Sequence, residues 1–193
     1  KGKMRKGRIM KKTFYVGILV LLLFCLPSVV SAAKYSIGAF GGMNIPIAQD
    51  DTKPGALFGV KGRIPLLPFL AVEPNFVVAN FKGKDLTVQD TLSYARKGGD
   101  FTSFGVDVIV GTLSGMSKLK FYGLAGINTN TYKRKGSENE TGLGLTIGTG
   151  FEFFPTDMLS VEIRSRYHPI KIGDGGRVHV EVSGGLNYYF GQE

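Results

Sequence analysis

A regular alternation of apolar and charged residues near the C-terminus most limits the folds that this chain can adopt. In LSVEIRSRYH, which begins at Leu159, apolar residues alternate with polar or charged ones. Successive side chains of a β-strand point to opposite faces, so the pattern predicts a strand with one apolar and one charged face. The charged face either meets water on an open sheet or fills the inside of a barrel whose outside is apolar.

The same type of segment recurs along the chain between groups of turn-forming residues. Eight strands are predicted, over residues 34–45, 55–64, 70–82, 99–111, 118–129, 142–154, 159–169 and 176–190. Pro74 within the third predicted strand suggests a local bulge, because proline has no backbone N–H to donate to a neighbouring strand.

The connections between these strands alternate in length and polarity. Three are short (65–69, 112–117 and 155–158), and four are longer or more polar (46–54, 83–98, 130–141 and 170–175). An even number of antiparallel strands with short turns at one end and longer loops at the other is typical of a transmembrane β-barrel. We therefore predict an all-β, eight-stranded, antiparallel, up-and-down barrel, with the short turns in the periplasm.

The net charge of +9 does not indicate a nucleic-acid-binding protein. Seven of the 24 Lys and Arg residues lie within residues 1–12, and the first acidic residue is Asp50. The rest of the chain has an excess of only two basic residues, with no concentrated phosphate-binding surface. We expect no nucleic-acid partner.

The N-terminal region has the features of a cleavable signal peptide. A basic start is followed by an apolar run from Phe14 to Leu26 and by small residues up to Ala33. The run is shorter than the roughly 20 residues of a membrane-spanning helix, which is the alternative interpretation. We predict a signal peptide over 1–33, in which 1–9 can be an upstream extension, and a barrel domain over 34–193. The single cysteine, Cys25, lies in the leader, so the exported domain has no cysteine-based metal site and no cofactor is expected.

Charged residues on the predicted inner faces are balanced in sign. The predicted lumen network contains five basic and five acidic residues: Lys61, Arg63, Glu73, Asp107, Lys120, Glu152, Glu162, Arg164, Arg166 and Glu181. Such balance is required inside a narrow barrel, because an unpaired buried charge costs several kcal/mol. Several of them, including Lys120, are expected to meet in a layer near the short turns.

Aromatic residues fall near the two ends of the predicted strands, as expected for girdles at the two membrane surfaces. Near the short turns these are Tyr35, Phe69, Phe121, Phe151, Phe153, Tyr188 and Phe190, and near the longer loops they are Phe81, Phe101, Tyr132 and Tyr167. A basic cluster in the third longer loop (Lys133, Arg134 and Lys135) can contact lipopolysaccharide phosphates, or it can be an ordinary solvated loop.

The segment GTGFEFFPTDMLSVEIRSRY resembles the penultimate strand, turn and strand of the OmpA-like and OmpX-like group of small outer-membrane barrels. The ending VEVSGGLNYYF resembles the final strand of that group. The resemblance implies that Phe190 is the terminal aromatic residue read by the barrel-assembly machinery. Two features depart from the family pattern: three residues follow Phe190, and the chain has no Trp.

The sequence does not favour an enzyme. Similarity to a lipid A deacylase would require a serine two residues after the histidine, whereas Ile170 follows His168 at that position. We expect His168 and His179 to be hydrogen-bonding groups of the lumen. The glycines of GLGLTIGTG lack the Lys-Ser/Thr ending of a phosphate-binding loop.

We predict a monomeric outer-membrane protein with a structural and surface-contact role, a filled lumen, and outer-membrane lipid and lipopolysaccharide as partners. The alternatives are adhesion or ligand binding through the longer loops, a lipid A-modifying enzyme, and a narrow solute channel.

Overall fold

The computed structural model describes residues 34–47, 52–83, 86–88, 92–94, 98–113, 117–134, 139–172 and 175–191. Residues 52, 86–88, 92–94, 134 and 172 are described by their backbone alone. The predicted signal peptide over 1–33 lies outside these ranges. Within them, no helix is long and apolar enough to cross a membrane.

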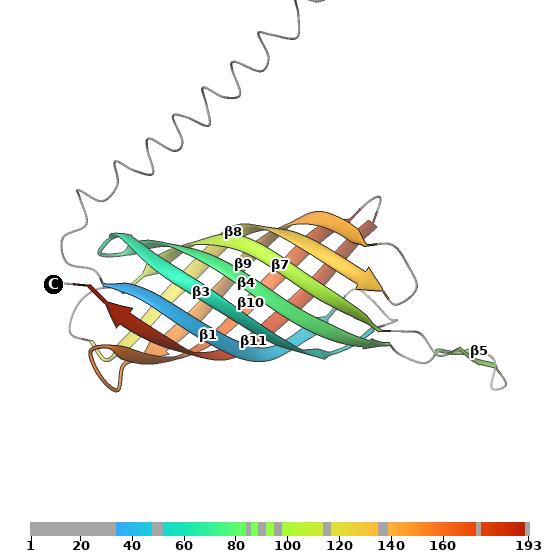
Figure 1. The fold of residues 1–193 in the computed structure, drawn as a ribbon, viewed down its shortest axis with the longest axis horizontal. Helices are drawn as coiled ribbons and strands as arrows, with labels where there is room; N and C mark the ends of the chain where they lie inside the picture. Colours follow the sequence, from blue (N-terminus) through green and yellow to red (C-terminus); the bar gives the residue numbers. More distant parts are fainter. Residues whose placement is uncertain are drawn as a thin grey trace, which may run out of the picture. The chain divides into compact units, whose positions relative to one another are not determined.

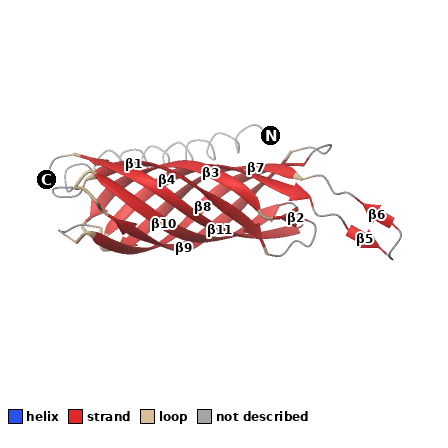
Figure 2. Cartoon of the chain, turned by 90° about the horizontal axis from the view of Figure 1, so that it is seen from below, coloured by secondary structure: helices blue, strands red, loops and turns tan. Residues whose placement is uncertain are grey.

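Eight long strands and one short strand form one sheet (Figure 1), and two further short strands pair with each other as a separate hairpin (Figure 2). The long strands are β1 (Tyr35–Pro46), β3 (Gly55–Leu67), β4 (Leu70–Gly83), β7 (Gly99–Gly111), β8 (Leu119–Arg134), β9 (Glu140–Phe153), β10 (Leu159–Ile172) and β11 (Gly175–Phe190). The short strand β2 (Thr52–Lys53) pairs with the end of β4, and β5 (Leu86–Val88) pairs with β6 (Leu92–Tyr94) as a separate hairpin.

The sheet closes into a barrel because β1 pairs with β11 and every long strand has two antiparallel neighbours (Figure 2). The predicted eight-stranded antiparallel barrel is confirmed. Following the paired residues once around the sheet leads from Asn187 to Arg177 on the same strand, a displacement of ten residues (187 to 177). This stagger tilts the strands and fixes a narrow barrel.

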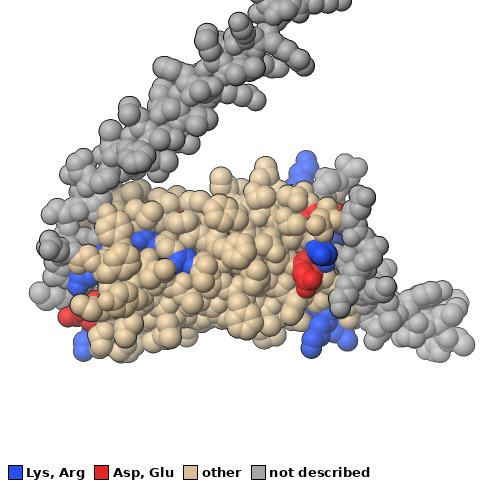
Figure 3. Space-filling model, viewed as in Figure 1, with Lys and Arg blue, Asp and Glu red and all other residues tan. Residues whose placement is uncertain are grey.

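Apolar side chains face outward and polar side chains face inward. On β10, Ile163 is 61% exposed and its neighbour Arg164 is 1% exposed. Burial alternates at every residue of β7 from Gly99 to Val110. Figure 3 shows that the side of the barrel is mostly uncharged and that Lys, Arg, Asp and Glu gather toward its ends. This arrangement matches a hydrocarbon environment around the barrel.

The strands at the loop end are longer than predicted. β8 continues to Arg134, β9 begins at Glu140, and only two residues separate β10 from β11. The predicted loop boundaries at 130–141 and 170–175 are therefore wrong. Polar pairs such as Thr131 with Thr141 continue the hydrogen-bonded ladder beyond the apolar band, and a sequence criterion based on apolar alternation ends the strands too early.

The predicted bulge at Pro74 is also wrong. Pro74 pairs with Val106 of β7, and the register between β3 and β4 is the same at Asn75 and at Val72 on either side of it. The register shift between β3 and β4 occurs at Pro65 and Leu67, next to the turn.

Candidate functional site: the ion-paired lumen

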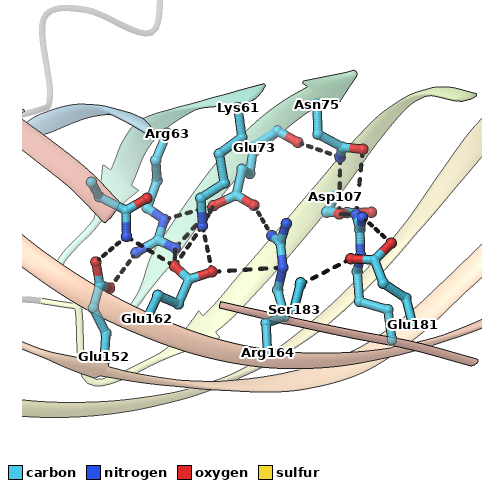
Figure 4. A network of polar contacts seen from close by, with 12 residues as sticks. Lys61, Arg63, Glu73, Asn75, Asp107, Glu152, Glu162, Arg164, Glu181 and Ser183 are labelled. Carbon is cyan, nitrogen blue, oxygen red and sulfur yellow. Dashed lines mark hydrogen bonds and ion pairs between the residues drawn. The ribbon is translucent and has the colours of Figure 1, made fainter. Parts of the chain in front are cut away.

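Nine of the ten charged residues predicted to face inward are at most 5% exposed; Lys120 is the tenth and is half-buried. They lie at alternate positions of β3, β4, β7, β9, β10 and β11, so the strand periodicity aims them at the barrel axis. Figure 4 shows how Arg63, Glu73 and Glu162, for example, meet in the lumen from three different strands.

Six charged residues form a lower cluster, nearer the short turns: Lys61, Arg63, Glu73, Glu152, Glu162 and Arg164. Arg63 contacts all three carboxylates of this cluster. Arg63 donates from Nε and Nη2 to Glu73 Oε2 at 3.0 and 2.9 Å, and from Nη1 to Glu152 Oε2 at 2.8 Å. Its Nη2 also lies 3.3 Å from Glu162 Oε2. One guanidinium therefore joins carboxylates from three strands.

The other members bind the same carboxylates from further strands. Lys61 Nζ donates to Glu162 at 2.5 Å and lies 3.6 Å from Glu73 Oε2. Arg164 Nη1 donates to Glu73 Oε1, and its Nε lies 3.6 Å from Glu162 Oε1. The lower cluster has three basic and three acidic groups, so its formal charges cancel.

Uncharged side chains complete the lower cluster. Glu152 Oε1 accepts hydrogen bonds from Asn187 at 2.8 Å, from Tyr189 at 2.6 Å and from Ser160. Asn187 also donates to Glu162 Oε2 at 3.1 Å. These partners are absent from the predicted network, although each one occupies the same strand face as the predicted charges.

The upper cluster lies nearer the loops and consists of Asp107, Arg166 and Glu181 with Asn75, Ser183 and His168. Arg166 donates to both oxygens of Glu181, from Nε at 2.9 Å and from Nη2 at 2.6 Å. Its Nη1 lies 3.3 Å from Asp107 Oδ2, which also accepts from Asn75 Nδ2 at 3.0 Å.

Phe40 lies against both clusters. Its ring centroid is 4.5 Å from Arg164 Cζ and 5.4 Å from Arg166 Cζ. A ring in this position stabilises the two guanidinium groups through its negative face. It also fills the space beside Gly59, where a Cβ atom would come within 2.3 Å of Phe40 Cζ.

An apolar group extends from Phe40 toward the loops. It contains Phe40, Leu57, Val77, Ala79, Phe81, Phe101, Tyr132 and Ile170. Phe81, Phe101 and Tyr132 are 3–5% exposed, so their predicted place in an outer lipid-facing girdle is wrong. Each of them lies an even number of residues from an inward-facing charged residue of its own strand, and so has the same parity. The pairs are Phe81 with Glu73, Phe101 with Asp107, and Tyr132 with Lys120. Tyr167, by contrast, is 42% exposed.

A second apolar group, nearer the short turns, contains Ala71, Ile109, Tyr122 and Leu124, with Leu113 packed against it. Tyr122 also lies under Arg63, whose Cζ is 5.0 Å from its ring centroid. Apolar groups therefore lie toward both ends of the ion-paired lumen.

The two histidines have different environments. His168 Nδ1 is 3.1 Å from Thr146 Oγ1 and 3.4 Å from Asn128 Nδ2. His179 instead stacks on Phe81, with 5.1 Å between ring centroids, and neither of its ring nitrogens has a hydrogen-bond partner among the described residues. The predicted hydrogen-bonding role is therefore wrong for His179.

The remaining predicted site residues that the structure describes lie at the two ends of the barrel. Lys120 is outside the ion-paired layer: it donates to the Leu113 carbonyl at 2.8 Å, and its Nζ is 4.4 Å from the Phe154 ring centroid. Lys133 and Arg134 belong to β8 rather than to a loop, and Lys135 lies outside the described residues. Phe190, the last residue of β11, stacks on Tyr35 at 6.2 Å.

Within the described ranges, no group of three or more His, Cys, Asp or Glu side chains is arranged to hold a metal ion. The lumen is a network of charge-assisted hydrogen bonds among strands, and such bonds are the stronger kind in proteins.

Solved structures with similar folds are small outer-membrane barrels. Neisserial surface protein A has a TM-score of 0.65 and 17% sequence identity, and the match covers 81% of this chain and 97% of that one. OprG from Pseudomonas aeruginosa has a TM-score of 0.58 and 16% identity, covering 83% and 97%. Ail, the attachment invasion locus protein of Yersinia pestis, solved with the heparin analogue sucrose octasulfate, has a TM-score of 0.51 and 20% identity, covering 83% and 100%.

These identities support a shared fold alone. No curated protein matches the chain. The family profile described as "Outer membrane protein beta-barrel domain" matches residues 16–190. This match covers most of the chain and agrees with the closed barrel, its apolar outside and its polar inside. The chain therefore belongs to the outer membrane protein beta-barrel domain family and is a protein of the bacterial outer membrane.

Proposed function

We propose that this protein is a non-enzymatic structural and surface-contact component of the outer membrane, and that its lumen is closed to solutes. The observation that supports this most is the interior: nine charged side chains, each at most 5% exposed, are joined across the lumen between two apolar groups. A solute that passed would have to separate buried ion pairs, which costs several kcal/mol for each uncompensated charge.

Conductance in planar lipid bilayers tests the closed lumen. We expect the folded barrel to add no ion conductance to that of the bare bilayer. The preparation must contain folded protein, which is checked by a change in SDS gel mobility on boiling. Steady single-channel currents from the same preparation would support the narrow-channel alternative instead.

The arrangement of the histidines supports a role without catalysis. A hydrolase needs a nucleophile within hydrogen-bond reach of a base and open to substrate. Ser183 Oγ donates to Glu181 at 3.1 Å, and His179 is stacked among aromatic rings at 1% exposure. We expect the mass spectrum of lipid A to be unchanged when the protein is expressed. A new lipid A species that depends on His168 or His179 would contradict this proposal.

Lysines at the loop end support contact with anionic groups of the outer leaflet. Lys53 and Lys82 are exposed and directly opposite each other on β2 and β4, and Lys133 is exposed on β8. Like charges directly opposite on neighbouring strands repel each other, so a bound anion would stabilise them. In the outer leaflet the available anions are lipopolysaccharide phosphates, and we propose these as the contact.

The triple variant Lys53→Gln/Lys82→Gln/Lys133→Gln tests this contact. Lipopolysaccharide should raise the unfolding midpoint of the wild-type barrel and should have a much smaller effect on the variant. Lys118→Gln, an exposed lysine at the short-turn end, is the matched control and should respond as the wild type does. An equal response in all three proteins would contradict the proposal.

Adhesion through the loops is the second candidate, because a β5–β6 hairpin lies within the connection between β4 and β7. Replacing residues 84–97 with a short Gly-Ser linker should abolish attachment to host cells if the hairpin is the adhesive element. Unchanged attachment would argue against adhesion through the hairpin and favour the structural role.

Phe190 is proposed to guide assembly of a monomeric barrel by the barrel-assembly machinery. It ends β11 and is 46% exposed. Phe190→Ala should lower the amount of folded protein in the outer membrane. Phe153→Ala provides a control, because Phe153 is 41% exposed near the same end of the barrel but ends β9.

A further inference from the structure

The two charged clusters of the lumen are not equally balanced. The lower cluster has three basic groups for three carboxylates, whereas in the upper cluster Arg166 is the one permanently basic group beside the carboxylates of Asp107 and Glu181. Both carboxylates are at most 2% exposed. If both were ionised, the upper cluster would have one uncompensated negative charge, which is costly in a buried site.

The geometry indicates which carboxyl group lacks compensation. Arg166 faces Glu181 with two nitrogens, at 2.9 and 2.6 Å. This bidentate arrangement is the strong form of an arginine–carboxylate pair. Among the described residues, Asp107 receives only the remaining Nη1 at 3.3 Å and the neutral amide of Asn75 at 3.0 Å, and both contacts end on Oδ2. Asp107 is therefore the weakly paired acid.

The register places a second acid beside Asp107. Glu73 on β4 is directly opposite Asp107 on β7, and the two are 0% and 1% exposed. Like charges at directly opposed positions destabilise a strand pair. Glu73 is ionised by necessity, because it joins Lys61, Arg63 and Arg164. The repulsion is removed if Asp107 is neutral.

The other elements around Asp107 offer no better compensation. The charged and titratable groups that act on it are Arg166, Arg164 and His168 from β10 and Glu73 from β4. Arg164 is bound to Glu73, and His168 Nε2 faces Glu181 at 3.6 Å. On β8, Asp107 Oδ1 lies against Gly126, where a Cβ atom would be 2.1 Å away. On β11, Glu181 is the acid of the upper cluster and pairs with Arg166.

We infer that Asp107 binds a proton in the folded barrel at neutral pH, so that the upper cluster contains a proton-binding site. Protonation of this carboxyl group removes the excess negative charge of the cluster. The carboxyl group can still accept the hydrogen bond from the Asn75 side-chain amide. In the unfolded chain the same carboxyl group is ionised above about pH 4. Unfolding therefore releases one proton, and raising the pH favours unfolding through this group.

Asp107→Asn tests the site, because the amide has nearly the same shape as the protonated acid and cannot exchange the proton. Unfolding constants in urea should be measured for wild type and variant between pH 5 and pH 7. If the folded wild type binds one more proton than the unfolded chain, the ratio of wild-type to variant unfolding constants rises about tenfold per pH unit. Glu152→Gln, in the balanced lower cluster, should unfold more easily than wild type at every pH while keeping the wild-type slope.

Infrared spectroscopy of the folded barrel gives a direct second measurement. At pH 7 a protonated-carboxyl band should be present in the wild type and in Glu152→Gln, and absent from Asp107→Asn. An Asp107→Asn variant that fails to fold, or that is destabilised equally at every pH, would overturn the inference. A second result would also overturn it: the wild type lacks the carboxyl band, and NMR shows that His168 is an imidazolium at pH 7. The proton would then be on His168.

Discussion

At the scale of single residues, the lumen depends on carboxylates that several bases share, and Glu73 is an example. Glu73 is 0% exposed and contacts Arg63, Arg164 and Lys61. A buried ion pair adds little stability relative to a well-packed apolar pair, but removing one partner leaves a charge without compensation. The network is therefore best tested by substitutions that remove one charge and keep the shape of the side chain.

Glu73→Gln should destabilise the barrel by about 3–5 kcal/mol, because two guanidinium groups and an ammonium group lose a shared counter-charge. The free energy of unfolding, measured in urea in lipid vesicles, checks this. Glu140→Gln is the control: Glu140 pairs with Arg177 at 3.9 Å with a side chain that is 57% exposed, and such pairs contribute about 0–1 kcal/mol. Equal effects of the two substitutions would contradict the account of the lumen.

Gly150 is a second residue with a specific structural requirement. A Cβ atom at this position would lie 2.1 Å from Tyr122 Cζ, whereas at Gly123 the nearest heavy atom would be 3.9 Å away. Gly150→Ala should force the Tyr122 ring away from Arg63 and destabilise the barrel by about 1–3 kcal/mol, the usual effect of overpacking. Gly123→Ala, on the lipid face, should leave the urea midpoint nearly unchanged. A stable Gly150→Ala barrel would show that the ring can move freely.

At the scale of strands, the parity of a residue decides which environment it meets. On β10 the charged residues Glu162, Arg164 and Arg166 are 1% exposed, while the intervening Ile163 is 61% exposed. A shift of one residue within a strand exchanges the two faces. The strand therefore tolerates changes of side chain far better than changes of length.

Insertion of one alanine between Arg164 and Ser165 should prevent folding. It would turn Arg166 toward lipid, at a cost of about 2–4 kcal/mol, and leave Glu181 without its partner. Insertion of alanine between Pro155 and Thr156, in an exposed turn, should be tolerated. Heat-dependent SDS gel mobility and protease protection measure the folded fraction. A folded Arg164–Ser165 insertion variant would mean that the register is not fixed by these contacts.

Strand parity also explains how much the sequence could predict. It placed nine charged residues and the apolar positions of β10 correctly with respect to the two faces. The same alternation indicates an inward Phe81, whereas its aromatic side chain predicts the membrane surface, where aromatic residues are common. Lys120 is on the predicted face but outside the predicted layer, because the position of a residue along the barrel axis depends on the stagger of the strands. The stacking of His179 on Phe81 depends on contacts between distant strands, which periodicity does not contain.

At the scale of the whole molecule, three environments should be distinguishable by chemistry: lipid, water and the closed lumen. Ile163 is the middle one of five outward positions on β10 from Leu159 to Tyr167. Lys171 lies about 20 Å from Ile163 along the barrel axis, given a rise of about 3.3 Å per residue and a tilt of about 40°. That distance exceeds half of an apolar band of about 25 Å. Ser183, 4% exposed, faces the upper cluster.

Single cysteines at these positions, in a Cys25→Ser background, should therefore react differently in lipid vesicles. Lys171→Cys should be labelled by a water-soluble maleimide, and Ile163→Cys only by a lipid-soluble thiol reagent. Ser183→Cys should react with neither until urea unfolds the barrel, because Glu181, Arg166 and their partners surround it. Labelling of Ile163→Cys from water would contradict its place in the bilayer. Labelling of folded Ser183→Cys from water would mean that the ion-paired lumen is hydrated, and would favour a channel over a closed structural barrel.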